Sequence, residues 1–128
     1  MPPSRIRKSL PQRAPKAREG MSASHLAMVR WKPCCVCGVP AHHAHHLLRT
    51  GEHGMGKKSS DRWCVPMCNT HHQALHSHGD EEAFLMSHGI DGRALASALW
   101  AARGDQEAME RVVFRFRQEA RLKKGNAA

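Results

Sequence analysis

The sequence is poor in the residues that build a large hydrophobic core. Its 128 residues include three Phe, three Trp and no Tyr, and 41% of them are hydrophobic. A chain of this length can form one small domain with tails, and such a domain often needs a metal ion or disulfides to stabilise its fold. The sequence also has no apolar run of about eighteen residues and no secretion signal at its N-terminus. We therefore expect a soluble, intracellular protein without a membrane-spanning segment.

Disulfides are not favoured as the stabilising element. The five cysteines are an odd number, and Cys34 and Cys37 form a Cys-x-x-Cys motif close to many histidines, which favours metal binding when a secretion signal is absent. A second motif, Cys68-x-x-His71, follows further along the chain. Two turns with two soft ligands each are what a closed tetrahedral zinc site requires, so these four residues are predicted to bind structural zinc. The alternative for any one cysteine is a small buried core residue, which is how we interpret Cys64.

Histidines are concentrated in one part of the chain, since nine of the eleven lie between positions 42 and 78. His72 and His76 are four residues apart in a predicted helix, so they share a face and can bind one ion. His45, on a neighbouring predicted strand, can supply a third ligand, and three protein ligands with open positions are typical of a catalytic metal ion. His46 points to the opposite side of that strand and is predicted to act as a general base.

Three parts of the chain differ in composition. Residues 1–24 are rich in proline and basic residues and are expected to form a disordered basic arm. Residues 25–79 are expected to contain the metal-binding core, with short strands in "AHHAHHLLR" and "RWCVPMC" and a helix that begins near Asn69 or Thr70, either of which can cap it. Residues 80–128 are expected to form a helical cap with a basic tail.

Three helices are expected in this last part. Asp80 is a suitable N-cap for the first helix, with Gly89 as its stop, and Asp91 starts the second. The third helix is expected over residues 105–124, with an apolar stripe formed by Met109, Val112, Val113, Phe116 and Ala120.

The net charge of +9 is located at the two ends of the chain. Residues 1–20 carry six Lys/Arg and one Glu, residues 111–124 also carry six and one, and the segment between them is close to neutral. Flanking basic segments suit a polyanionic partner, most often nucleic acid. A charged tail that only increases solubility is the alternative.

The segment "CCVCG…HAHHLLRTGEHGMGKKSSDRWCVPMCNTHHQALH" resembles the HNH endonuclease motif, a ββα-metal fold. It is particularly similar to a phage and prophage branch that includes the domain-of-unknown-function 968 proteins and, more distantly, the RecA-dependent nuclease called recombination enhancement function protein. The resemblance covers roughly residues 31–79. It implies an α+β protein with a small ββα-metal core, a structural zinc knuckle and C-terminal helices.

The resemblance also implies roles for individual residues. His46 matches the general base, and His45, His72 and His76 match the ligands of a catalytic ion. The middle Asn of the motif has no clear counterpart, and Asp61 lies nearest to its place; Asp61 could orient the loop or His46, or it could ligate the metal. The structural zinc set is matched by Cys34, Cys37, Cys68 and His71.

The implied activity is metal-dependent hydrolysis of DNA phosphodiester bonds with low sequence specificity, in phage or prophage DNA recombination or processing. Arg49, Lys57 and Lys58 could hold flanking phosphates, or could belong to a solvated loop. The nitrogen-rich ligand set favours Zn²⁺, Ni²⁺, Co²⁺ or Mn²⁺ over Mg²⁺, unless Asp61 joins it. The expected partners are DNA and a recombination protein filament, and the expected location is the bacterial host cytoplasm, with association to the nucleoid when DNA is bound.

Two other functions would each explain part of the sequence pattern. A non-catalytic zinc-dependent DNA-binding module would keep the Cys/His zinc set but would have no use for the second set of histidines. A histidine-rich metal buffer would explain the number of histidines, but not their spacing to the cysteines or the basic ends of the chain. The presence of both sets in one chain therefore favours an enzyme.

Overall fold

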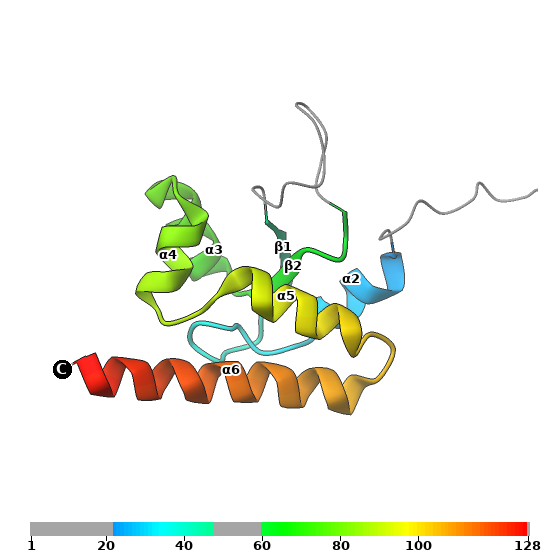
Figure 1. The fold of residues 1–128 in the computed structure, drawn as a ribbon. Coiled ribbons are helices and arrows are strands. Elements are labelled where there is room, and N and C mark those ends of the chain that lie inside the picture. The colour runs from blue at the N-terminus through cyan, green and yellow to red at the C-terminus, as the bar shows by residue number, and fades with distance from the viewer. Residues whose placement is uncertain (1–21, 48–59, 128) are drawn as a thin grey trace, which may run out of the picture.

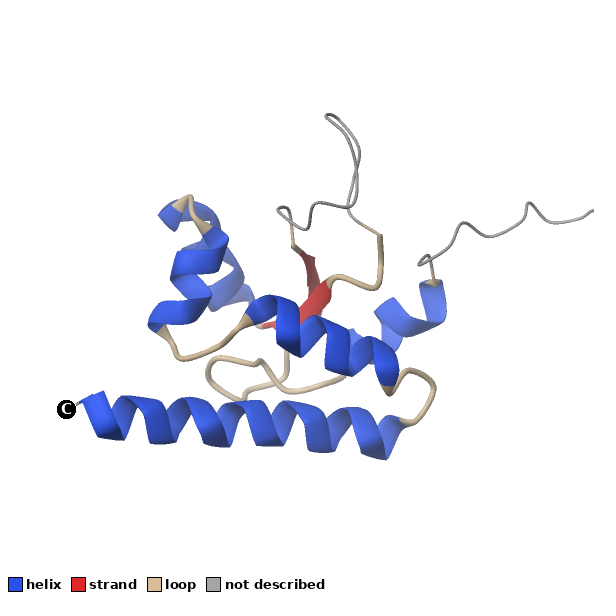
Figure 2. Ribbon diagram, viewed as in Figure 1, coloured by secondary structure: helices blue, strands red, loops and turns tan. Residues whose placement is uncertain are grey.

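This computed structural model of the protein describes residues 22–47 and 60–127, with side chains up to residue 124. The described residues form a mixed α+β architecture, as expected, in which one small sheet is surrounded by helices (Figures 1 and 2). The elements, in chain order, are α2 (Ala23–Arg30), β1 (His43–His46), β2 (Cys64–Met67), α3 (Asn69–His78), α4 (Glu81–Ser87), α5 (Gly92–Ala101) and α6 (Gln106–Ala127).

The sheet consists of β1 and β2, which pair antiparallel with His43 opposite Met67 and His46 opposite Cys64. Both strands were expected from the sequence. Pro66 has no N–H group to donate, and in a two-stranded sheet it lies on an edge strand, as expected. Its carbonyl accepts a hydrogen bond from the Cys35 N–H at 3.0 Å, so the chain around Cys35 covers the outer edge of β2.

Helix α2 was not expected from the sequence. Ser22 is its N-cap, and the Ser22 Oγ accepts from the His25 N–H at 3.1 Å. The two buried residues of the helix are His25 and Val29, and the His25 ring packs edge-to-face on Trp100. Since one of its two buried side chains is an imidazole, the helix lacks the apolar stripe by which a sequence reveals a buried helical face. Of the segment expected to be a disordered arm, residues 22–24 belong to this helix and its cap, and the rest lies outside the described residues.

Most helix boundaries agree with the capping residues in the sequence. Asp80 accepts from the Ala83 N–H at 3.0 Å, and Asp91 accepts from the Ala94 N–H at 3.1 Å. Helix α3 begins at Asn69, as expected, but its N-cap is a correction, because Cys68 and not Asn69 or Thr70 caps it. The Cys68 sulfur accepts a hydrogen bond from the N–H of His71, a role that standard capping preferences assign to Ser, Thr, Asp or Asn.

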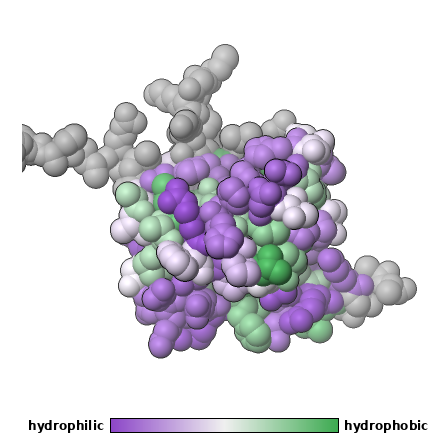
Figure 3. Space-filling model, turned by 180° about the vertical axis from the view of Figure 1, so that it is seen from behind, coloured by the Kyte–Doolittle hydropathy of each residue, from purple (hydrophilic) through white to green (hydrophobic). Residues whose placement is uncertain are grey.

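One core joins the sheet to the C-terminal helices. Helix α5 contacts both β2 and α6, and α2 contacts both strands. Of the expected α6 stripe, Met109, Val112, Val113 and Ala120 are buried and Phe116 is half-buried. None of the helices in the described part of the chain has the length and apolar character needed to cross a membrane. On the face opposite to that of Figure 1, hydrophilic residues predominate and apolar residues form small patches between them (Figure 3).

Two glycines offer a matched test of how closely α6 packs. Gly79 and Gly89 have φ values of 87° and 78°, which strain any residue with a Cβ. A Cβ at Gly89 would lie 3.0 Å from the Ala120 Cα, whereas a Cβ at Gly79 would meet no atom within 4 Å. We expect Gly79→Ala to lower the free energy of unfolding by about 1–2 kcal/mol through strain alone. Gly89→Ala should cost clearly more, because the backbone of α6 must also move. Urea unfolding of both variants measures the difference, and equal losses would contradict this packing.

Candidate metal centres

Cys34, Cys37, Cys68 and His71 form the first candidate centre, and one ligand atom of each lies within 4.8 Å of the others. Cys34 and Cys37 belong to a tight turn in which the Cys34 N–H donates to the Val39 carbonyl at 2.7 Å. The turn needs the φ of 84° at Gly38, which is unfavourable for other residues. Cys68 and His71 come from the start of α3.

The distances in this cluster fit a tetrahedral zinc ion. The sulfur atoms of Cys37 and Cys68 are 3.8 Å apart. His71 Nδ1 lies 3.3 Å from the Cys68 sulfur and 4.0 Å from the Cys34 sulfur. Around tetrahedral zinc, two sulfur ligands lie about 3.8 Å apart, and a sulfur and a nitrogen about 3.6 Å apart. The cluster can therefore hold a structural metal ion such as zinc, as the sequence motifs predicted.

Backbone N–H groups favour the thiolate form of Cys68 in this cluster. Burial raises the pKa of Cys37, and it acts in the same direction on Cys68. At Cys68, however, hydrogen bonds from the backbone of His71 and Thr70 and from neighbouring thiols outweigh burial, so the pKa of this thiol is lowered. The Cys34 sulfur also accepts from the Val36 N–H at 3.4 Å. At Cys68 the donors favour the charged form of sulfur, which is the form that binds zinc.

The other two cysteines lie in the core. Cys64 is fully buried, its Sγ donates to the Asp61 carbonyl at 2.9 Å, and burial together with the Asp61 charge raises the pKa of this thiol to about 12. Cys35 is also buried, and burial raises its pKa. Both thiols therefore stay protonated, which agrees with the interpretation of Cys64 as a core residue.

We expect the purified protein to retain zinc through dialysis against a weak chelator, because four preorganised ligands bind it tightly. Cys37→Ser should abolish this zinc and lower the melting temperature, and a strong chelator should lower that of the wild type but not of the variant. Cys64→Ala is the matched control: it removes a buried sulfur, so it also destabilises the protein, but it should leave the zinc content unchanged. Elemental analysis and thermal unfolding give both readouts. Loss of zinc from Cys64→Ala, or its retention in Cys37→Ser, would show that the ligands are assigned wrongly.

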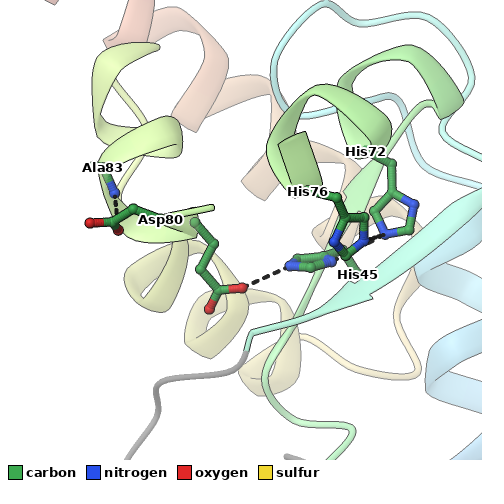
Figure 4. Close-up of polar contacts among 6 residues, drawn as sticks. His45, His72, His76, Asp80 and Ala83 are labelled. Carbon is green, nitrogen blue, oxygen red and sulfur yellow. Dashed lines mark hydrogen bonds and ion pairs between the residues drawn. The ribbon is translucent and has the colours of Figure 1, made fainter. Parts of the chain in front are cut away.

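His45, His72 and His76 form the second candidate centre (Figure 4). His45 comes from β1 and is buried, and the other two lie one turn apart on α3. His72 Nε2 is 3.2 Å from His45 Nδ1 and 3.2 Å from His76 Nε2. Around a tetrahedral ion with nitrogen ligands, two such atoms lie about 3.3 Å apart. The spacing fits a divalent cation with three nitrogen ligands.

The neighbouring imidazoles also affect the protonation of His72. Burial, followed by the neighbouring rings of His45, His76 and His43, lowers the pKa of His72 to about 4. His72 is therefore neutral at neutral pH and has a lone pair available for a cation. His43 stacks on His72 with ring centroids 4.9 Å apart, so a fourth imidazole supports this side of the centre.

Glu81 contacts this centre through His45. Its Oε1 lies 2.9 Å from Nε2 of His45, and both side chains are buried. Figure 4 draws this contact as a dashed line from the His45 ring. No spacing rule connects positions 45 and 81, so the sequence carried no signal for the pair.

His46 and Asp61 meet on the opposite side of β1. His46 Nε2 is 2.9 Å from Asp61 Oδ1, and the His46 side chain is 35% exposed. The second oxygen, Oδ2, accepts from the Ser22 N–H at 2.7 Å. Asp61 thus contacts His46 and lies outside both groups of candidate ligands in the described residues. Arg49, Lys57 and Lys58, predicted to contact phosphates, lie outside the described residues.

The family model described as "Protein of unknown function (DUF968)" matches residues 9–102, which include both metal centres, His46, Asp61 and Glu81. The chain belongs to this family. The expected similarity to the domain-of-unknown-function 968 proteins is thereby confirmed, and α6 lies outside the matched range. The chain is also 39% identical over 75 residues to "Uncharacterized protein YdfU" from Escherichia coli (strain K12). This similarity covers 59% of the chain but 21% of the relative, so the chain spans about a fifth of its length. No solved structure matches the chain.

Proposed function

We propose that this protein is a metal-dependent DNA endonuclease of the HNH type, which hydrolyses phosphodiester bonds with low sequence specificity. The observation that carries the proposal is that two adjacent histidines of β1 lie on opposite faces of the strand and have different surroundings. His45 faces α3 and joins a three-histidine centre, whereas His46 faces the other way and contacts a carboxylate. The order β1, β2, α3, with a Cys/His cluster at the start of α3, supports a ββα-metal core.

His46 is the proposed general base. In donating its Nε2–H to Asp61, His46 keeps the lone pair of its neutral ring on Nδ1, which can accept a proton from water. The partial exposure of the side chain allows water to reach this nitrogen. The deprotonated water attacks the phosphorus of the scissile bond. Asp61 acts as a positioning residue, because it orients the ring and stabilises the imidazolium that forms.

A divalent cation bound by His45, His72 and His76 would supply positive charge opposite the phosphate and the leaving 3′ oxygen. All three ligands are neutral nitrogen donors, which favours Mn²⁺, Co²⁺, Ni²⁺ or Zn²⁺ over Mg²⁺. The Asp61 oxygens contact His46 and the Ser22 N–H, so Asp61 adds no carboxylate to this ligand set.

The basic charge of the chain supports DNA as the substrate. Helix α6 carries exposed basic side chains, among them Arg111, Arg115 and Arg121. Basic side chains of this kind bind the phosphate backbone without reading base sequence, and this binding weakens as the salt concentration rises. A role in phage or prophage DNA recombination, with a recombination protein filament as partner, is part of the proposal and derives from the resemblance of the motif.

A plasmid-nicking assay tests the activity. Zinc-loaded protein is incubated with supercoiled DNA at low salt, with Mn²⁺, Co²⁺, Ni²⁺ or Mg²⁺ added separately. We expect nicking by the wild type and a rate about 10²–10⁴-fold lower for His46→Ala, because the general base is lost. His78→Ala, which removes an exposed histidine at the end of α3, should nick like the wild type. If the wild type binds DNA but cuts with none of these ions, the non-catalytic DNA-binding module is the better assignment.

Asp61 should affect nicking only through His46. In Asp61→Asn the side chain no longer offers two acceptors, so it cannot serve both His46 and the Ser22 N–H, and the rate should fall. The double variant His46→Ala/Asp61→Asn should be no slower than His46→Ala alone, since two residues that act as a unit are not additive. Rates are compared under single-turnover conditions. A further loss in the double variant would indicate that Asp61 has a separate role.

A further inference from the structure

Glu81 is a buried carboxylate that the proposed mechanism does not use. It is 9% exposed and lies in the first turn of α4, where Asp80 caps the helix (Figure 4). The left-handed conformation of Gly79 ends α3, so α4 begins directly after it. Glu81 contacts His45 across 36 positions of the chain. Burying a carboxylate is costly unless it is paired, and His45 is one partner of Glu81, at 2.9 Å.

The contact determines which nitrogen of His45 is available to a cation. A neutral imidazole carries its single proton on one nitrogen, and a carboxylate 2.9 Å from Nε2 stabilises the proton there. The lone pair is then on Nδ1, the atom that lies 3.2 Å from His72 Nε2. Glu81 therefore turns the metal-binding nitrogen of His45 toward the other two histidines.

The contact also supplies charge. Three neutral imidazoles provide no negative charge to balance a dication, and a carboxylate hydrogen-bonded behind a metal-binding imidazole makes that ligand more basic. We propose that Glu81 is the positioning residue of the three-histidine centre: it holds His45 in the tautomer and orientation that bind the cation and provides the negative charge that the ligands lack. This inference rests on the proposed function only in that the centre binds a cation; it does not require that DNA is cut.

The surroundings of Glu81 make it suitable for substitution. It lines a cavity of about 380 Å³ between α4 and α5, together with residues such as Leu47 and Leu85. A changed side chain therefore has room without displacing a helix. Glu82, the next residue in the same turn, is exposed and provides a matched control.

The test measures Ni²⁺ affinity by calorimetry on the full chain with its zinc loaded and without DNA. Glu81→Gln keeps the shape and an acceptor oxygen but removes the charge, and we expect it to weaken Ni²⁺ binding by about tenfold to a hundredfold. Glu82→Gln should bind like the wild type, and His72→Ala should lose the binding, which locates the ion. Equal affinity of Glu81→Gln and wild type, or wild-type binding that His72→Ala does not change, would overturn the proposal.

A second readout separates positioning from a structural role. Nitrogen-15 NMR of His45 should report a proton on Nε2 in the wild type and in Glu81→Gln, and a loss of that preference in Glu81→Leu. If Glu81 only stabilised the fold, these variants would melt earlier while the tautomer and the Ni²⁺ affinity of the folded protein stayed unchanged.

A wild type that does not nick DNA, with Glu81→Gln still weakened in Ni²⁺ binding, would reject the nuclease and retain this inference. Nicking by the wild type with unchanged Ni²⁺ affinity in Glu81→Gln would retain the nuclease and reject this inference.

Discussion

Cys68 takes part in two interactions at once, and the rest of the site depends on this combination. It is a member of the Cys/His cluster with Cys34, Cys37 and His71, and it is also the N-cap of α3. The residues that can hold zinc therefore also determine where α3 begins and which way it points. Since α3 carries His72 and His76, the geometry of the second centre follows from that of the first. In a chain with few aromatic residues, a metal ion is an effective substitute for core volume.

The side chains of strand β1 alternate between two faces, which places two adjacent histidines in different surroundings. Neighbouring residues of a strand point to opposite faces, so His45 and His46 serve different environments although they are adjacent. Each has a carboxylate 2.9 Å from Nε2: Glu81 for His45 and Asp61 for His46. In the proposed mechanism this leaves both Nδ1 atoms with a lone pair, one directed at a cation and the other at water. In that mechanism, the same carboxylate–imidazole contact supports a metal ligand on one face of the strand and a general base on the other.

Helix α2 is connected to the site through Asp61, whose second oxygen accepts from the Ser22 N–H at the start of the helix. The helix buries His25, whose ring nitrogens have no hydrogen-bond partner among the described residues. Burial, with Arg103 nearby, lowers the pKa of His25 and keeps it neutral, although the Asp61 charge acts in the opposite direction. A buried imidazole without partners stabilises the fold less than an apolar residue of similar size would. Asp61 therefore joins the start of α2 to His46.

Both ligand groups and the two faces of β1 could be predicted from the sequence, because they depend on short spacings. A Cys-x-x-Cys turn, histidines one helical turn apart and alternation along a strand determine local geometry wherever the segment lies in the fold. The caps at Asp80 and Asp91 are local in the same sense. The tertiary structure decided the rest: the pairing of Glu81 with His45, the contact of Asp61 with both His46 and α2, and the burial of His25. These contacts join residues distant in sequence, and they arise from the way α4, α2 and the segment before β2 pack against the sheet, which no periodicity in the chain encodes.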